Sequence, residues 1–514
     1  MVTREYEGLA GAGGLKDVSR QLAEALARKG KDVSVVMPLY GFMSPEEAGF
    51  VLTDLSFEVD MPYVGTDRRE LVRIWSAKRK EVVIYLVDAL RFRAKRSIYT
   101  YTFADEGENP ENKKGYGHID YFAMNLLLQK ATIGLLICLN KKPDIIHCQD
   151  GHAALLPVMI REIDGYRHYF RKTGFVVTIH NAGRGYHQGI DDLAFVEKIT
   201  GLSSRVIFDN LLERDFDPLL AASSYAVLNT VSENYARELM ETDDDEQTGW
   251  LGHRLRQRGM VLEGITNGIN PEDFDPKVPE NLGIAAAYSP LQGKMDGKAK
   301  CKAALVELLG KKMDGIMQRG ELDPQPEQPL FTFIGRLTAQ KGVDKMIGAL
   351  EALLPVEHDF QVVILGAGEK EIENALLKLS GSKQNKGRIC VLYGYDSLLA
   401  NRIYAAGDFF LIPSQYEPCG LTDFIAQLFG NIPIVHQVGG LVKVIDGVSG
   451  FGYREHNSAA LMGAMQQALD IFRNKPGKIG QIRKSAVKNI YKNFTWDIRV
   501  ARYEELYRKS LSLI

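Results

Sequence analysis

Short runs of apolar and β-branched residues alternate with helical patterns along almost the whole chain. Runs of this length, bounded by turn residues, predict buried strands. In the first half of the chain they are residues 32–37, 81–87, 144–148, 174–179 and 225–230. In the second half they are residues 330–334, 361–365, 388–391, 408–412 and 432–435. Two successive series of alternating strands and helices predict an α/β chain with two doubly wound, Rossmann-like domains.

The alternation is interrupted near residues 275–300, where prolines and glycines precede a lysine-rich helix. A segment with this many prolines and glycines is typical of a connection between domains. We therefore predict a first domain over residues 1–280 and a second over residues 281–494. Residues 50–115 are rich in charges and turn residues, and they predict a surface insertion in the first domain.

The strand predicted before the first glycine cluster is shorter than a central strand normally is. A glycine cluster that binds phosphate normally follows a complete buried strand, and a central strand has about five residues. Here only Met1, Val2 and Thr3 precede Arg4. We expect the chain to begin inside its first strand.

Length and composition narrow the classes of function. A chain of 514 residues is too long for one ordinary core. The net charge of −2 provides no basic field, so neither nucleic acid nor a membrane is an expected partner. Five cysteines without Cys-x-x-Cys spacing argue against disulfides and zinc. The longest apolar run, about residues 131–139, is far shorter than a membrane span. These features predict a soluble cytoplasmic enzyme.

Two cations and one carboxylate follow predicted strands of the second domain. Arg336 and Lys341 come after the strand that ends at residue 334, and Glu417 comes after the strand that ends at residue 412. Most single charged residues are simply solvated, but here both cations flank a turn bounded by glycines. The combination is what a sugar nucleotide needs. Its diphosphate must be neutralised as it leaves, while a carboxylate holds sugar hydroxyls.

A predicted helix begins directly after Glu417, in the segment Glu417-Pro-Cys-Gly-Leu-Thr422. Backbone amides of Gly420 to Thr422 at its N-terminus can hold a donor phosphate. In most proteins a glutamate in this position only stabilises a helix.

A glycine cluster opens the first helix of the first domain, with Gly11, Gly13, Gly14, Lys16 and Asp17 in close succession. Glycines let the backbone approach a phosphate, and a helix N-terminus attracts anions. Such a cluster alone is weak evidence, because most of them are ordinary tight turns.

Polar residues also end two strands of the first domain. Asp150 follows one strand, and His180-Asn181 follows the next. His147 and His152 could join Asp150 as metal ligands, but a carboxylate that caps a helix beside two structural histidines is the simpler interpretation. Ligands of open α/β sheets bind at this end of the strands.

Three further positions have both a structural and a functional interpretation. Asn267 lies in an Asn-Gly turn, which needs no function to exist. Gly368 belongs to a Gly-Ala-Gly turn after a strand, which is either a second nucleotide loop or a plain turn. Tyr395 follows another strand and is either a nucleobase contact or a buried core residue.

These segments resemble the family of bacterial glycogen synthases and plant starch synthases from residue 8 to about residue 507. The resemblance implies the GT-B fold, in which two Rossmann-like domains face each other across a cleft. It also implies that the final helix, residues 495–514, returns to the first domain. The implied reaction transfers glucose, with retention, from a nucleoside-diphosphate-glucose to the non-reducing end of an α-1,4-glucan. We expect ADP-glucose as the donor.

The resemblance also implies roles for single residues. Arg336 and Lys341 would bind the distal phosphate, Glu417 would contact glucose hydroxyls, and the backbone carbonyl of His180 would face the reacting carbon. The implied substrate-binding residues are Gly13, Gly14, Asp17, Asp150, Asn181, Asn267, Gly368, Tyr395, Cys419, Gly420, Leu421 and Thr422. Because two cations bind the diphosphate, no metal ion or other cofactor is expected.

The chain departs from the family pattern at Gly11, where the family has a lysine that contacts the donor. Lys16 is the nearest cation that could replace it, although we expect it on a different face of the turn. UDP-glucose therefore stays open as the donor. Two other functions also stay open, which are a retaining GT-B transferase with a small or surface-sugar acceptor and a catalytically silent glucan-binding protein. A dehydrogenase and a phosphorylase lack their motifs.

Overall fold

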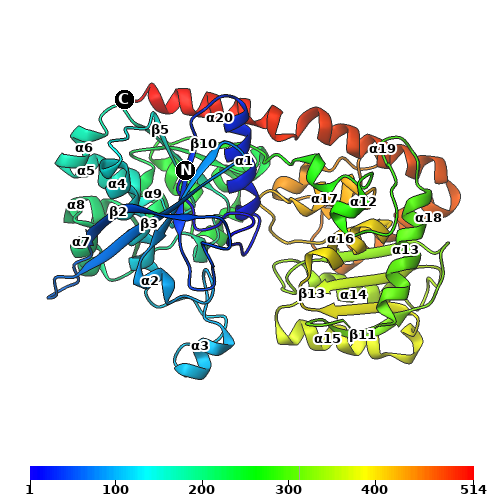
Figure 1. Cartoon of the computed structure of the whole chain (residues 1–514). Coiled ribbons are helices and arrows are strands. Elements are labelled where there is room, and N and C mark those ends of the chain that lie inside the picture. Colours follow the sequence, from blue (N-terminus) through cyan, green and yellow to red (C-terminus); the bar gives the residue numbers. More distant parts are fainter. Residues whose placement is uncertain (312) are drawn as a thin grey trace. The chain divides into compact units, whose positions relative to one another are not determined.

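The computed structural model describes residues 1–311 and 313–514. It forms two compact units, the first made of residues 1–268 and 496–514 and the second of residues 269–495 (Figure 1). The sequence pattern placed the boundary at residue 280, twelve positions later. The segment between these positions contains the short helix η3 (Pro271–Phe274) and α12 (Pro279–Leu282), which belong to the second unit.

The first unit contains two four-stranded arrays that the N-terminal residues join. One array has the order β1 (Ser34–Pro38), β4 (Val82–Asp88), β3 (Arg69–Arg79) and β2 (Val51–Asp60). The other has the order β10 (Leu262–Gly264), β9 (Val227–Thr230), β6 (Gly174–Ile179) and β5 (Ile145–Gln149). Val2 forms parallel bridges to Val36 and to Cys148, so residues 1–3 occupy a short strand between β1 and β5.

The prediction of a surface insertion at residues 50–115 is wrong for its larger part. β2 and β3 are antiparallel strands that extend the sheet beyond β4. Most side chains of β2 are exposed or half-buried, and a strand at a sheet edge keeps this polar composition. Only the segment that follows β4 leaves the sheet. It contains α2 (Leu90–Arg93) and α3 (Phe103–Glu108), which extends away from the strands in Figure 1.

Helices complete the first unit. They are α1 (Leu15–Arg28), α4 (Tyr121–Cys138), α5 (Leu155–Glu162), α6 (Asp164–Tyr169), α7 (Leu193–Thr200), α8 (Ser204–Asp209), α9 (Pro218–Ala222), α10 (Glu233–Glu241), α11 (Leu251–Gln257) and α20 (Trp496–Leu511). Shorter elements are η1 (Arg184–Tyr186), η2 (Asp243–Thr248) and the hairpin β7 (Leu211–Leu212) with β8 (Asp215–Phe216). The last helix is held by buried Trp496, whose indole Nε1 donates to Gln21 Oε1 of α1 at 2.8 Å.

Helix α4 is long and apolar enough to cross a membrane by length and composition. However, 67% of its residues are buried inside the protein. A Cβ added at Gly134 on this helix would lie 2.6 Å from the ring of Phe57 on β2, so the helix packs directly on the sheet. These contacts are those of a core helix.

The second unit is a seven-stranded sheet. Its order is β11 (Met317–Leu322), β14 (Arg388–Tyr393), β13 (Gln361–Gly366), β12 (Leu330–Ile334), β15 (Phe409–Ile412), β16 (Ile432–His436) and β17 (Phe451–Tyr453). All pairs are parallel except β11 with β14. β11 is not among the strands predicted from the sequence, because an antiparallel edge strand with alternating exposure lacks a continuous apolar run.

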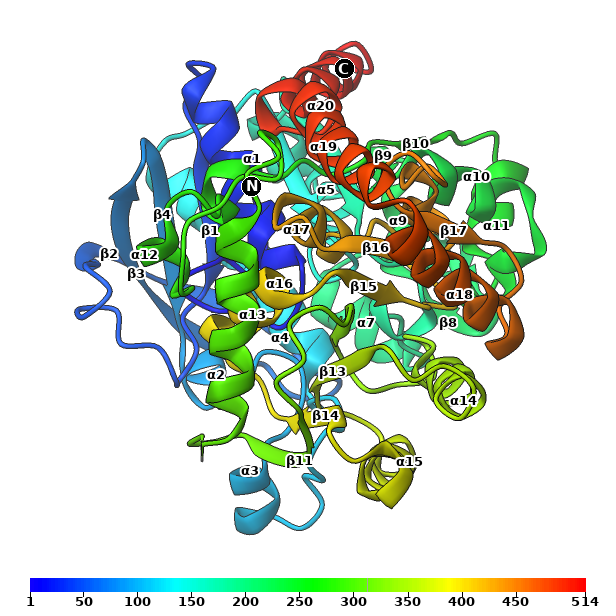
Figure 2. The same cartoon turned by 90° about the vertical axis from the view of Figure 1, so that its right-hand side faces the viewer.

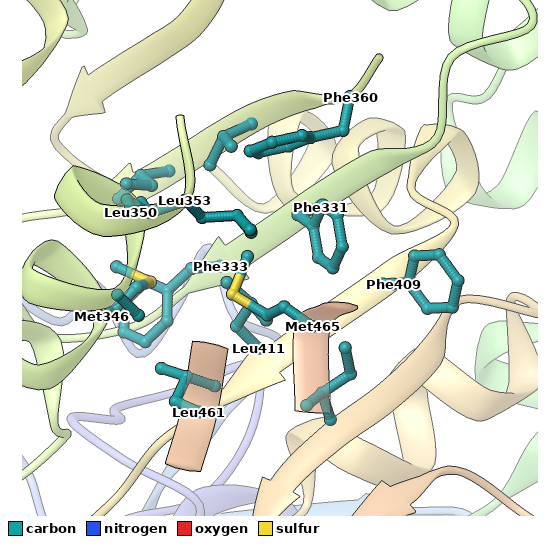
Figure 3. Close-up of a cluster of buried hydrophobic side chains, with 14 of the residues drawn as sticks. Phe331, Phe333, Met346, Leu350, Leu353, Phe360, Phe409, Leu411, Leu461 and Met465 are labelled. Atoms are coloured by element: carbon teal, nitrogen blue, oxygen red, sulfur yellow. The ribbon is translucent and has the colours of Figure 1, made fainter. Parts of the chain in front are cut away.

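Helices cover both faces of this sheet (Figure 2). On one face are α14 (Val343–Leu353), α15 (Lys370–Gly381), α18 (Ser458–Asn474) and α19 (Pro476–Asn493). On the other are α13 (Asp296–Leu309) and α16 (Ser397–Ala406). The remaining short helices are α17 (Thr422–Leu428), η4 (Lys383–Asn385) and η5 (Gly439–Lys443). Figure 3 shows the first face, where Phe331 and Phe409 of neighbouring strands stack with ring centroids 5.1 Å apart.

The strand order places a topological switch point at β12. This strand pairs with β13 on one side and with β15 on the other, and chain order runs outward from it in both directions. The loops after β12 and β15 therefore leave the same edge of the sheet in opposite directions. In open α/β sheets, ligands bind at such a point.

Packing on this sheet yields a stability prediction. Leu350 on α14 is fully buried, whereas Leu377 on α15 is 42% exposed. Leu350→Ala should destabilise the second unit by about 2–5 kcal/mol, because it removes apolar contacts and leaves a cavity. Leu377→Ala is the matched control and should cost under about 1 kcal/mol. Urea denaturation of both variants measures the difference, and equal costs would contradict the assigned core.

Candidate active site

The switch point of the second unit holds a close ion pair. Lys341 Nζ donates to Glu417 Oε2 at 2.6 Å, and Ser414 Oγ donates to the same oxygen at 3.0 Å. Lys341 follows β12, and Glu417 follows β15. The side chains are 25% and 12% exposed, respectively, so the pair is largely removed from solvent. The sequence predicted both residues as catalytic, and the fold brings them into contact.

Glu417 carries a negative charge in this setting. Burial alone would raise its pKa, but the ammonium of Lys341 and the hydroxyl of Ser414 favour the ionised form. The net effect is a pKa below the ordinary value for glutamate. The site thus presents a fixed carboxylate beside an ammonium group with further donor capacity.

The second predicted cation, Arg336, lies on the same turn as Lys341. Its side chain is exposed, and its Nη2 donates to Gln340 Oε1 at 3.3 Å. The turn is held against the next strand's loop, because Leu337 N donates to Ala367 O and Leu337 bridges to Gly368. Gly368 is therefore a direct neighbour of the Arg336 turn.

Tyr395 follows β14 at the same edge of the sheet. Its side chain is 76% exposed, so the interpretation as a buried core residue is wrong. An exposed ring is accessible to a ligand, and the nucleobase contact stays a prediction.

The segment from Glu417 to Thr422 is packed tightly against the turn Val438–Leu441. Gly440 N donates to Glu417 O at 2.9 Å. A Cβ at Gly439 would lie 2.0 Å from Glu417 O, and one at Gly440 would lie 2.2 Å from Cys419 O. Only glycines permit this approach. Gly420 has φ +73°, Leu421 precedes α17, and Thr422 is the first residue of that helix.

In the first unit, Asp150 and His180 are joined at the ends of β5 and β6. The His180 amide donates to Asp150 Oδ1 at 2.6 Å, and the His180 ring Nε2 lies 2.6 Å from Gln149 Oε1. Asp150 adopts φ +55°, a backbone conformation that is uncommon for residues other than glycine. The strand ends are thus fixed by side chains rather than left as free loops.

Burial governs the charges of this pair. It lowers the pKa of His180 to about 3, so the imidazole is neutral. It raises the pKa of Asp150 to about 7, although the amides of His180 and Asn181 favour the carboxylate. The two histidines that could have joined Asp150 in a metal site are engaged elsewhere. His147 contacts Thr178 and Tyr507, and His152 Nε2 accepts from Arg4 N.

The glycine loop in front of α1 is organised by Glu5. Its Oε2 accepts from the amides of Ala12 at 2.7 Å and Gly13 at 3.1 Å. Gly14 directly precedes α1, and Asp17 lies in its first turn. The amide of Gly13 thus already has an anionic partner within the protein.

The expectation that Lys16 lies on a different face of the turn from residue 11 is wrong. A Cβ at Gly11 would lie 2.2 Å from Lys16 Cδ, so the lysine stem crosses the place of a residue-11 side chain. The Lys16 ammonium lies 2.8 Å from both carboxylate oxygens of Asp17. A cation is therefore present beside the loop even though residue 11 is glycine.

Asn181 and Asn267 have different local roles. Asn181 Oδ1 accepts from Gly183 N at 2.8 Å and fixes the turn after His180. Asn267 is buried, and within the part of the chain that the structure describes its Oδ1 has no hydrogen-bond partner.

His187, which no sequence motif indicated, fixes the loop after Asn181. Its Nδ1 lies 2.5 Å from Asp217 Oδ2, and its Nε2 lies 2.7 Å from Ala182 O. Both ring nitrogens thus face oxygen atoms that can accept a hydrogen bond. Burial alone would lower the pKa of His187, but Asp217 raises it above the ordinary value. No motif or spacing in the sequence links residues 187 and 217, so this pair could not be predicted from the sequence.

Comparisons with known proteins find matches to both units. Residues 1–256 match the family model described as starch synthase catalytic domain, and residues 317–484 match glycosyl transferases group 1. A glycogen synthase of Moorella thermoacetica is 31% identical, over 99% of this chain and 96% of its own. One of Anaeromyxobacter dehalogenans is 32% identical, over 96% and 95%.

The chain belongs to the glycogen synthase family. It is accordingly a retaining glycosyltransferase. The GT-B fold agrees with a solved relative, the catalytic domain of starch synthase IV from Arabidopsis thaliana bound to ADP and acarbose. That structure has a TM-score of 0.81 and 24% identity, and the match covers 99% of this chain and 98% of the other.

Membership of the glycogen synthase family makes the titration of Asp150 a useful probe of the site. Its folded pKa lies above the unfolded value, so its ionisation costs stability as pH rises from about 4 to 7. Asp150→Asn abolishes this cost. The variant should gain on the order of 2 kcal/mol over wild type between pH 5 and pH 8. Urea denaturation at both pH values measures it, and a pH-independent difference would refute the assignment.

Proposed function

We propose that this enzyme transfers glucose from ADP-glucose to the non-reducing end of an α-1,4-glucan. The observation that carries the proposal is the Lys341–Glu417 pair at the switch point of the second unit. It supplies a cation for a diphosphate and a carboxylate for sugar hydroxyls at one place. The starch synthase IV structure, which holds ADP and acarbose, supports an adenine nucleotide and a glucan-like acceptor for this chain.

The second unit binds the nucleotide end of the donor. Arg336 and Lys341 neutralise the distal phosphate, and the amides from Gly420 to Thr422 hold phosphate oxygens. Lys341 can do so while it stays paired with Glu417, because an ammonium has three N–H donors. Exposed Tyr395 stacks on the base, and Gly368 lines the nucleotide beside the Arg336 turn.

Residues of the first unit have proposed roles toward a sugar. The backbone carbonyl of His180 faces the anomeric carbon, and Asp150 fixes that peptide through the His180 amide. Asn181 and Asn267 contact sugar hydroxyls. Neutral His180 suits this role, since a positive charge beside an oxocarbenium-like carbon would raise the barrier.

The reaction follows from these charges. The bond between the anomeric carbon and the diphosphate oxygen breaks while Arg336, Lys341 and the loop amides take up the developing negative charge. The acceptor hydroxyl attacks from the same face and passes its proton to the departing phosphate oxygen. Glu417 stabilises the positive sugar between these events. Retention follows from attack on the face that the leaving group vacates.

Lys16 takes the place of the loop lysine that is absent at position 11. Its stem crosses Gly11, and Asp17 holds its ammonium in the absence of donor. An incoming diphosphate or sugar hydroxyl competes with Asp17 for that ammonium. The reaction takes place in the cytosol, where the five cysteines stay reduced.

The function is tested by incubating the protein with glycogen and labelled ADP-glucose or UDP-glucose. We expect incorporation into polymer from ADP-glucose in preference to UDP-glucose, because the adenine nucleotide is the supported donor. Incorporation from UDP-glucose alone would show that UDP-glucose, and not ADP-glucose, is the donor. Turnover without glucan would indicate a small acceptor, and no turnover in folded protein would indicate a silent glucan-binding protein.

The Lys341–Glu417 pair should account for much of the reduction in the activation free energy of the transfer reaction. Lys341→Met should lower kcat about a hundredfold or more, equivalent to about 3 kcal/mol of charge stabilisation. Lys345→Met is the matched control, since Lys345 pairs with Asp344 on the exposed side of α14 and should keep wild-type kcat. Initial rates at saturating donor compare the two. Wild-type turnover of Lys341→Met would rule out the assigned role.

The proposed role of Lys16 can be tested by moving the lysine from position 16 to position 11. Lys16→Ala should lower kcat/KM for the donor about tenfold or more, because one charge-assisted contact is lost. Gly11→Lys in the Lys16→Ala background should restore most of it, since the new side chain enters the space that the Lys16 stem vacates. Unchanged kcat/KM in Lys16→Ala, or no recovery in the double variant, would contradict the proposal.

A further inference from the structure

Lys443 is a buried ammonium that the proposed reaction does not use. Its side chain, at the end of η5, is 7% exposed. Nζ donates to Gly420 O at 2.7 Å, to Gly440 O at 3.1 Å and to Cys419 O. It also lies 3.0 Å from Asp423 Oδ1. Four oxygen atoms therefore surround one nitrogen.

The environment of Lys443 Nζ is suited to a positive charge. Burying an ammonium is costly unless hydrogen bonds and an opposite charge compensate. Here three carbonyl oxygens and one fully buried carboxylate do so, and the Phe424 ring lies 4.5 Å from Nζ. The ammonium links the segment after Glu417 to the turn Val438–Leu441. Without it, three carbonyls would face one another around an empty space.

The contacts fix the direction of two peptide groups. In a trans peptide the C=O and the following N–H point in opposite directions. The carbonyls of Cys419 and Gly420 point toward Lys443. The N–H groups of Gly420 and Leu421 therefore point away from it, on the opposite side of the loop. These are two of the amides proposed above to hold the donor phosphate.

Gly420 makes this orientation depend on an external constraint. Its φ of +73° lies in a region that glycine enters freely, so the residue itself does little to hold one conformation. The packing of Gly439 and Gly440 holds one side of the loop, and the ammonium of Lys443 bonds these carbonyls on the other.

We propose that Lys443 is a positioning residue for donor recognition, which turns the amides of Gly420 and Leu421 toward the diphosphate by holding the carbonyls of Cys419 and Gly420. The inference rests on the proposed function of the loop. It assigns Lys443 an effect on the phosphate part of the donor and none on the nucleoside part.

A simpler role for Lys443 is to neutralise Asp423. Burial raises the pKa of Asp423 to about 6, while Lys443 favours its ionised form and Glu417 opposes it. Gln427 Nε2 also donates to Asp423 Oδ2 at 3.2 Å. If neutralisation were the whole role, Lys443 would become dispensable once residue 423 had no charge. Under our proposal it stays necessary.

Asp423→Asn is therefore the reference, and Asp423→Asn with Lys443→Met is the test. The double variant buries no unpaired carboxylate, so it avoids the main reason for misfolding. Calorimetric titration with ADP and with adenosine separates the phosphate contacts from the nucleoside contacts. We expect the double variant to bind ADP about tenfold or more weakly than the reference, with unchanged adenosine affinity. Its kcat should fall as well.

Equal ADP affinity in the double variant and the reference would overturn the proposal. A parallel loss of ADP and adenosine affinity would do so too, because it would indicate general distortion. Thermal melts establish folding. Should the double variant not fold, Lys443→Gln in the same background reaches fewer carbonyls, and the same selective loss is expected. Wild-type protein that does not bind ADP would instead contradict the proposed donor, and UDP with uridine would then provide the comparison.

Discussion

The ion pair between Lys341 and Glu417 is the interaction on which the active-site account depends. A buried carboxylate is costly, and in this chain an ammonium at 2.6 Å keeps it ionised. The pair exists because β12 and β15 are adjacent parallel strands whose following loops leave the same sheet edge. Removing one partner would leave the other charge buried and uncompensated. The ionised state of Glu417 thus depends on the strand order that brings Lys341 beside it.

The same constraint explains why the remaining candidate residues gather at strand ends. In each unit the parallel strands carry their polar residues at the carboxyl end, and side chains then fix the emerging loops. Asp150 holds the His180 peptide in the first unit, and Lys443 holds the Gly420 peptide in the second. Both contacts orient backbone groups. Preorganised dipoles of this kind need no rearrangement when charge develops.

The strand positions could be predicted from the sequence where burial is complete. The runs at residues 174–179 and 330–334 coincide with β6 and β12, because strands covered on both faces read as continuous apolar segments. Antiparallel edge strands could not be predicted in this way. β2 and β11 expose alternate side chains, and their composition resembles that of loops. Register and strand order also depend on contacts far apart in the chain.

Motifs predicted the candidate residues of the site, but not their partners. The segments around Lys341 and Glu417 are distinctive, whereas Glu5, Gln149 and Lys443 gave no local signal. Each acts through a contact with a residue distant in sequence or through the direction of a peptide group. Gly11 shows the opposite case, where a missing motif residue left the identity of the donor open. The structure instead places the Lys16 stem over that position.

The central claim is that this chain moves glucose from ADP-glucose to a glucan with retention. The most direct measurement follows the reaction of ADP-glucose with maltohexaose by ¹H NMR, with Glu417→Gln protein as the blank. The account predicts a growing α-1,4 anomeric signal with wild-type protein and release of ADP at the same rate. A β-anomeric product, hydrolysis to free glucose without chain growth, or equal rates in wild type and the Glu417→Gln variant would contradict it.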